Sequence, residues 1–94
     1  MKKVRIIISG KVQGVGFRYW LYKKATERKI YGWVKNIIMN KVEAVLVGNT
    51  KDIDYIIKLC EKGPTSAKVT SIKTVDYEET LLTKSFNIIK NNYN

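Results

Sequence analysis

The chain has 94 residues, 45% of them hydrophobic, which suits one domain with a single core and argues against intrinsic disorder. Its one cysteine, Cys60, excludes an internal disulfide, and no apolar run approaches the roughly 20 residues of a membrane span. The net charge of +10 arises from residues 1–41, which carry 11 Lys and Arg against one acid, so the expected partner is an anion unless the charge only keeps the protein soluble.

The first predicted element is a strand over residues 4–9 (VRIIIS), a short β-rich segment that ends at Gly10. A glycine-rich loop follows. Apolar residues then recur at helical spacing, which predicts a helix over 17–28. The residues on its apolar face are Phe17, Trp20, Leu21 and Ala25.

Two further strands are predicted over 30–37 and 41–48, joined by a tight connection near Met39 and Asn40. In the second of them, apolar residues alternate, with Val42, Ala44 and Leu46 on one face and Glu43, Val45 and Val47 on the other. The two strands should therefore form a hairpin.

A second helix is predicted from an N-cap at Thr50 to a stop at Gly63-Pro64. Acidic residues lie near its start and lysines near its end, as the helix dipole favours. Its buried stripe consists of Ile53, Ile56, Ile57 and Cys60. Cys60 is thus interpreted as a small core residue and not as a nucleophile. Strands over 68–79 and 85–90 complete the chain, the last at an edge of the sheet.

This order predicts an α+β fold, a ferredoxin-like βαββαβ sandwich with both helices on one face of an antiparallel sheet and an extra C-terminal strand. In that topology the first two strands run parallel, with the third between them. Their C-terminal ends lie on the same edge, about 10 Å apart. The glycine loop leaves one of these ends and Asn36 lies at the other, a gap that suits a phosphate held between two side chains.

The loop QGVGFR (13–18) has the features of an anion site. Gly14 and Gly16 allow positive φ and inward-pointing N–H groups, and the following helix adds its positive end. Arg18 lies in the first helical turn, where its guanidinium can grip a phosphate with two hydrogen bonds. The loop has neither the Gly-Lys-Ser/Thr ending nor the third glycine of the common nucleotide loops. A structural turn with a solvated arginine therefore stays possible on this pattern alone.

The segments GKVQGVGFRYW (10–20) and YGWVKNIIMNKVEAVLVGN (31–49) together resemble the two signature segments of the acylphosphatase family. The similarity covers nearly the whole chain, including EKGPTSAKV and SFNII. It implies hydrolysis of acyl phosphates to a carboxylate and inorganic phosphate without metal or cofactor. By this resemblance, Arg18 is the phosphate-binding arginine and Asn36 the asparagine that positions water. The implied phosphate loop consists of Gln13, Gly14, Val15, Gly16, Phe17 and Arg18.

Two positions depart from the family pattern. Asn40 replaces a usual glycine in the hairpin turn, and Asn is the residue best able to adopt positive φ after glycine. Lys29 replaces a glycine commonly found after the first helix, which costs about 1–2 kcal/mol if that position is left-handed. Neither change affects the expected chemistry.

The chain has no histidine. An acyl phosphate needs no general acid, because its carboxylate leaving group has a conjugate acid with a pKa near ~4. A loose transition state for phosphoryl transfer also needs little general-base assistance. Positioning and charge stabilisation remain, and these suit Arg18, the loop N–H groups and Asn36.

Two other functions would also fit parts of the sequence. An RNA-binding ferredoxin-like module would suit the charge, but the segments VRIIIS and KVEAVLVG lack the stacking aromatics that such modules use. A domain that binds an acyl or carbamoyl phosphate without turnover is the other, and such domains occur within larger proteins. We expect a free-standing, monomeric, cytoplasmic enzyme of one domain (1–94) acting on a small-molecule acyl phosphate, with no nucleic-acid or membrane partner.

Overall fold

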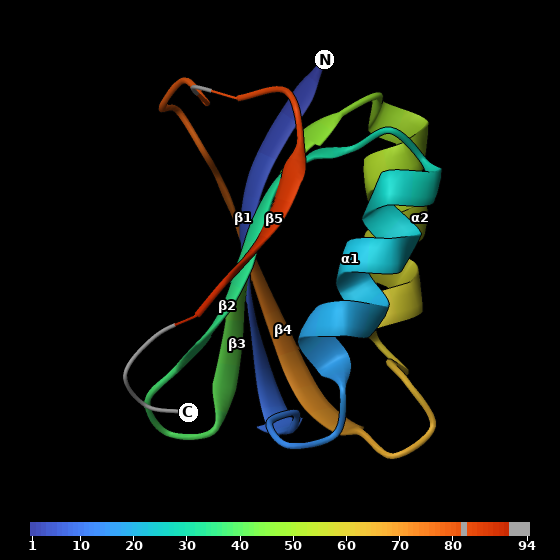
Figure 1. Ribbon diagram of the computed structural model, residues 1–94, viewed down its shortest axis with the longest axis vertical. Coiled ribbons are helices and arrows are strands. Elements are labelled where there is room, and N and C mark those ends of the chain that lie inside the picture. The colour runs from blue at the N-terminus through green and yellow to red at the C-terminus, as the bar shows by residue number, and fades with distance from the viewer. Residues whose placement is uncertain (82, 91–94) are drawn as a thin grey trace.

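The computed structural model describes residues 1–81 and 83–90, which form one five-stranded sheet with two helices on one face (Figure 1). The predicted order of elements is confirmed. The elements are β1 (Lys2–Lys11), α1 (Phe17–Glu27), β2 (Tyr31–Ile37), β3 (Lys41–Gly48), α2 (Thr50–Cys60), β4 (Lys68–Asp76) and β5 (Phe86–Ile89).

The strand order is β4-β1-β3-β2-β5. β3 pairs antiparallel with both β1 and β2, so these two strands run parallel on either side of it, as the ferredoxin-like topology requires. The C-terminal ends of β1 and β2 therefore lie at the same end of the sheet, where the loop after β1 comes close to the end of β2. The extra strand β5 lies at an edge, as predicted. It pairs parallel with β2, so the sheet is mixed and not wholly antiparallel.

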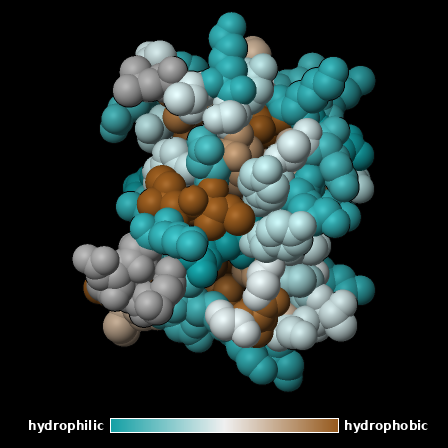
Figure 2. Space-filling view, viewed as in Figure 1, coloured by the Kyte–Doolittle hydropathy of each residue, from teal (hydrophilic) through white to brown (hydrophobic). Residues whose placement is uncertain are grey.

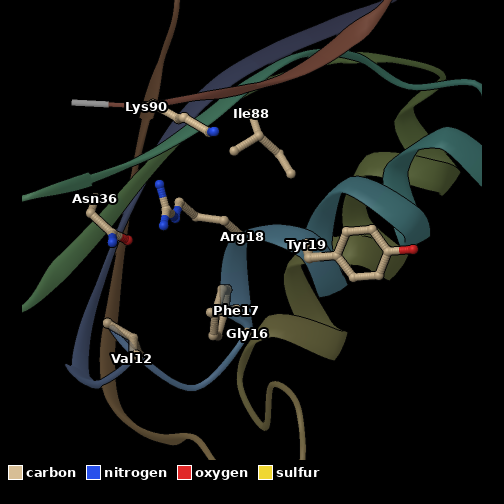
Figure 3. A pocket seen from close by; sticks show the side chains of 9 residues that line it. Val12, Gly16, Phe17, Arg18, Tyr19, Asn36, Ile88 and Lys90 are labelled. Carbon is tan, nitrogen blue, oxygen red and sulfur yellow. The ribbon is translucent and has the colours of Figure 1, made fainter. Parts of the chain in front are cut away.

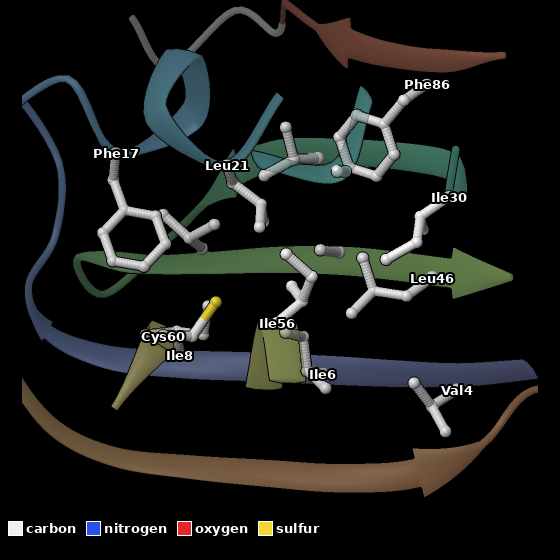
Figure 4. Close-up of a cluster of buried hydrophobic side chains, with 14 of the residues drawn as sticks. Val4, Ile6, Ile8, Phe17, Leu21, Ile30, Leu46, Ile56, Cys60 and Phe86 are labelled. Carbon is white, nitrogen blue, oxygen red and sulfur yellow. The ribbon is translucent and has the colours of Figure 1, made fainter. Parts of the chain in front are cut away.

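A single hydrophobic core fills the space between the sheet and the helices (Figure 4). Alternate residues of β1 and β3 form one side of the core, and one face of each helix forms the other side. The apolar residues at period 2 in the strands therefore pack against those at period 3.6 in the helices. The buried helix residues are Phe17, Leu21 and Ala25 in α1 and Ile53, Ile56 and Cys60 in α2. Burial raises the pKa of the Cys60 thiol to about 12, in keeping with its predicted role as a core residue.

Several local predictions are corrected by the structure. The N-cap of α2 is Asn49 and not Thr50: the Asn49 side chain accepts a hydrogen bond of 2.9 Å from the backbone N–H of Lys51. Either residue type can cap a helix, and here the chain enters the helix one residue earlier. The fourth strand ends at Asp76 and not at residue 79. Val45 and Val47 lie on the face of β3 opposite Val42 and Ala44, as predicted, and they too are buried because β3 is the central strand of the sheet.

The surface seen in Figure 2 is mostly hydrophilic, with a hydrophobic patch near the middle of that face. Across residues 1–81 and 83–90, neither helix has the length and hydropathy needed to cross a membrane.

Some residues other than glycine have a left-handed backbone conformation, including the two positions where the sequence departs from the family pattern. Lys29 has φ 56° directly after α1, and in the hairpin turn Met39 and Asn40 have φ 68° and 58°. The expectation for Asn40 is thus confirmed, while Met39 is a second, unforeseen residue at positive φ. A lysine side chain is disfavoured in this region, so Lys29 holds strain that glycine would relieve.

We therefore expect Lys29→Gly to raise the free energy of unfolding by about 1 kcal/mol, or roughly 4–8 °C in melting temperature. Thermal unfolding followed by circular dichroism measures this. The matched control is Lys58→Gly at an exposed position in the last turn of α2, which should lower stability, by at most about 1 kcal/mol. A Lys29→Gly protein no more stable than the parent would show that the left-handed backbone carries no strain.

Candidate active site

The loop between β1 and α1 is shaped by two glycines. Gly14 has φ 72° and Gly16 has φ 78°, and an added Cβ at either position would meet no atom within 4 Å. The glycines are therefore needed for the backbone conformation and not for space. Left-handed residues within a turn let successive N–H groups point to one side, which creates a concave site for an anion.

The start of α1 extends this concave surface. The first helical hydrogen bond runs from the N–H of Trp20 to the carbonyl of Gly16, at 3.0 Å. No side chain caps the helix, and its first turn contains no acid. The N–H groups that precede this bond and the positive end of the helix dipole are therefore available to an anion.

Gln13 ties the loop to the end of the hairpin. Its Nε2 donates hydrogen bonds to the carbonyl of Ile37, at 2.6 Å, and to the carbonyl of Lys41, at 2.9 Å. Ile37 ends β2 and Lys41 begins β3. The Gln13 side chain thus faces the hairpin and holds the glycine loop next to the strand that carries Asn36. The sequence placed Gln13 in the loop but gave no sign of this contact, because its partners lie 24 and 28 residues away.

Arg18 and Asn36 line one pocket of about 200 Å³ at this edge of the sheet. In Figure 3 the Arg18 guanidinium extends from the start of α1 toward Asn36 on β2. Asn36 is the one polar residue in the buried set of the described chain, with 4% of its surface exposed. It lies on the core face of β2, where Val34 is also buried. The two segments that resemble family signatures therefore converge, as the topology predicted.

The Arg18 side chain carries an unusual feature. Its Nη1 is buried and has no hydrogen-bond partner among residues 1–81 and 83–90. A buried guanidinium N–H group without a partner is costly, because burial removes the water that would otherwise satisfy it. An anion in the pocket would satisfy this group, and a phosphate oxygen matches the geometry of a guanidinium well.

The other predicted loop residues fall into two groups. Gly14, Gly16 and Phe17 line the pocket with Arg18, whereas Gln13 and Val15 do not. The pocket also includes residues that the sequence did not single out, namely Val12, Tyr19, Ile88 and Lys90. Ile88 and Lys90 come from the region of β5, and only its pairing with β2 brings them to the site.

The pocket lining contains no acidic residue. Elsewhere in the described part of the chain, no group of three or more His, Cys, Asp or Glu side chains is placed to hold a metal ion. The groups that the site offers to a ligand are backbone N–H groups, one carboxamide and the cations of Arg18 and Lys90.

Comparison with known proteins gives consistent matches. The sequence model of the acylphosphatase family matches residues 4–88. An acylphosphatase of Chlorobaculum tepidum is 38% identical over 88 residues, which are 94% of this chain and 96% of that protein. The crystal structure of acylphosphatase from Bacillus subtilis has a TM-score of 0.88 and 35% identity, covering 95% of this chain and 99% of that one. The T. kodakarensis HypF structure has a TM-score of 0.80 and 32% identity, covering 94% of this chain but 12% of that chain.

Proposed function

The chain belongs to the acylphosphatase family and has its activity, the hydrolysis of acyl phosphates to a carboxylate and inorganic phosphate; we propose that Arg18 and Asn36 are its catalytic residues. In this proposal the phosphoryl group binds in the loop 13–18, and water attacks it from the side of Asn36. The observation that carries the proposal is the buried, unpartnered Nη1 of Arg18 in a pocket shared with Asn36.

Arg18 and the loop bind the phosphoryl oxygens. The left-handed Gly14 and Gly16 and the uncapped start of α1 supply backbone N–H donors, and the guanidinium supplies two charged donors. These groups are fixed before substrate arrives, so they can stabilise the charge of the transition state without reorganising. The absence of acids from the lining keeps the site favourable for a dianion.

Asn36 positions the attacking water through its carboxamide. The residue lies near the C-terminal end of β2, which is paired on both sides in the sheet, and such a strand position is rigid enough to fix a water molecule relative to the phosphorus. No general acid is needed, because the leaving carboxylate has a conjugate acid of pKa about 4. An oxygen of the phosphoryl group accepts the proton of the water, so the reaction requires neither histidine nor a cofactor.

The protein acts on a small-molecule acyl phosphate, as a cytoplasmic monomer of one domain and without nucleic acid as a partner. A single, buried, unpaired cysteine suits a reducing compartment. The compact core that both helices share is consistent with one folding unit.

Release of inorganic phosphate from benzoyl phosphate in the presence of EDTA tests the proposed activity. We expect turnover that is unaffected by the chelator, because the proposed chemistry involves no metal. Binding of phosphate without any hydrolysis would instead favour the alternative, a non-catalytic binding domain. The match to the HypF structure covers 12% of that chain, so a domain of this fold also occurs within a longer protein. Loss of activity on chelation would contradict the proposed mechanism.

A further inference from the structure

Lys90 is the one residue of the pocket lining, besides Arg18, whose side chain carries a charge. Lys90 has no role in the hydrolysis as proposed for Arg18 and Asn36. Figure 3 shows Lys90 and Ile88 on one side of the Arg18 side chain, with Val12 and Gly16 of the loop on the other. The ammonium group of Lys90 therefore approaches the pocket from the opposite side to the glycine loop.

The position of Lys90 follows from strand pairing. β5 pairs parallel with β2, and the register aligns Val34 with Ile88 and Lys35 with Ile89. One further step along this register places Lys90 beside Asn36. Side chains alternate between the two faces of a sheet, so Lys90 shares the face of Ile88, which is also the face of Asn36. The pairing of β5 with β2 thus places the ammonium group of Lys90 near the Asn36 carboxamide, which is proposed to hold the attacking water.

Two cations that line the same pocket repel each other, and an anion bound between them offsets this repulsion by attracting both. No salt bridge within residues 1–81 and 83–90 involves either Arg18 or Lys90; the four that occur are Lys2–Asp54, Arg5–Glu43, Arg28–Asp52 and Lys35–Glu43. The pocket lining contributes no carboxylate to offset the two charges. A doubly charged phosphoryl group fits this arrangement, because it has enough oxygen atoms to accept from the loop, from the guanidinium and from an ammonium group.

We propose that Lys90 is a second cationic residue that binds the phosphoryl group, contacting it from the β5 side while Arg18 and the loop hold the rest. The proposal rests on the proposed function, since it concerns the same pocket. Substrate and product both carry the phosphoryl oxygens, so Lys90 binds the two alike. Such uniform binding lowers KM and strengthens inhibition by inorganic phosphate, and leaves kcat nearly unchanged.

The test replaces Lys90 by Met, which keeps the length of the side chain and removes its charge. We expect the Kd for inorganic phosphate, measured by calorimetry at low ionic strength, to rise about tenfold, the effect of one charge-assisted hydrogen bond at an exposed site. The KM for benzoyl phosphate should rise in parallel, with kcat within about twofold of the parent. Lys90→Arg should restore most of the affinity for phosphate.

The matched control is Lys84→Met, which removes a lysine that is also exposed but lines a different cavity, next to Phe86 and Tyr22. It should change the Kd for phosphate by less than about twofold, because a screened surface charge acts weakly at a distance. Equal effects of Lys90→Met and Lys84→Met, or a fall in kcat without a change in Kd, would overturn the role of Lys90. Phosphate binding does not require turnover, so this result is independent of whether the parent protein hydrolyses benzoyl phosphate.

Discussion

Replacing Arg18 with glutamine is expected to lower kcat/KM for benzoyl phosphate by at least about 10²–10³-fold, the usual cost of removing one preorganised donor from a charged transition state. Glutamine keeps a polar side chain of moderate length but loses the charge and the paired donors. The Nη1 group that the pocket buries without a partner disappears with it. The fold should survive, because the core contacts of α1 come from Phe17, Leu21 and Ala25.

The matched control for this change is Arg28→Gln, at the other end of the same helix. Arg28 is exposed, pairs with Asp52 at 3.1 Å and lies over the Tyr55 ring at 3.7 Å. Its replacement removes one positive charge from the protein, as Arg18→Gln does, so it controls for the attraction between the net positive charge of the protein and the anionic substrate. We expect steady-state kinetics of Arg28→Gln to stay within about threefold of the parent. Equal activity in the two variants would contradict the catalytic role of Arg18.

Replacing Asn36 with alanine is expected to lower kcat by at least about 10²-fold, with a smaller change in KM. The reason is that Asn36 is proposed to act on the attacking water, whereas the loop and Arg18 hold the phosphoryl group. The binding of inorganic phosphate, measured by calorimetry, should therefore persist in this variant. A protein that binds phosphate but hydrolyses benzoyl phosphate slowly is the expected result.

Asn36 is buried, so Asn36→Ala also needs a check on stability. Thermal unfolding provides it, and activity is then compared at a temperature where both proteins are folded. Asn87→Ala is the control, because Asn87 lies on the neighbouring strand, is exposed, and donates a 3.0 Å hydrogen bond only to nearby Ser85 among the contacts described. It should retain full activity. If Asn36→Ala were also fully active, water would be positioned by some other group.

The order of elements and the meeting of the two motifs could be predicted from the sequence. Apolar residues alternate clearly in the segment 41–48 and recur at helical spacing in the two predicted helices, whereas the first strand is predicted from its β-rich composition. The βαββαβ order then leaves few topologies that bury both kinds of pattern. Because β3 lies between β1 and β2 and is antiparallel to both, the C-terminal ends of β1 and β2 must lie at the same end of the sheet. The proximity of Arg18 and Asn36 is thus a consequence of topology.

What the sequence did not predict depends on contacts between distant segments. Asn49 and Thr50 are both good capping residues, and only the path of the chain into α2 decides between them. The two hydrogen bonds of Gln13 have backbone carbonyls as acceptors, which any residue could supply. Lys90 lies at the pocket because of the register in which β5, a short edge strand, pairs with β2. The local sequence of a strand does not determine which residues of the neighbouring strand it pairs with.

A crystal structure of the protein with inorganic phosphate bound would test the proposed active site directly. We expect the phosphate to lie in the 200 Å³ pocket, accepting hydrogen bonds from the backbone N–H groups of the loop 13–18 and from the Arg18 guanidinium, with Asn36 facing it. A phosphate bound elsewhere on this basic protein, with Arg18 turned away from an unliganded pocket, would contradict the proposed active site.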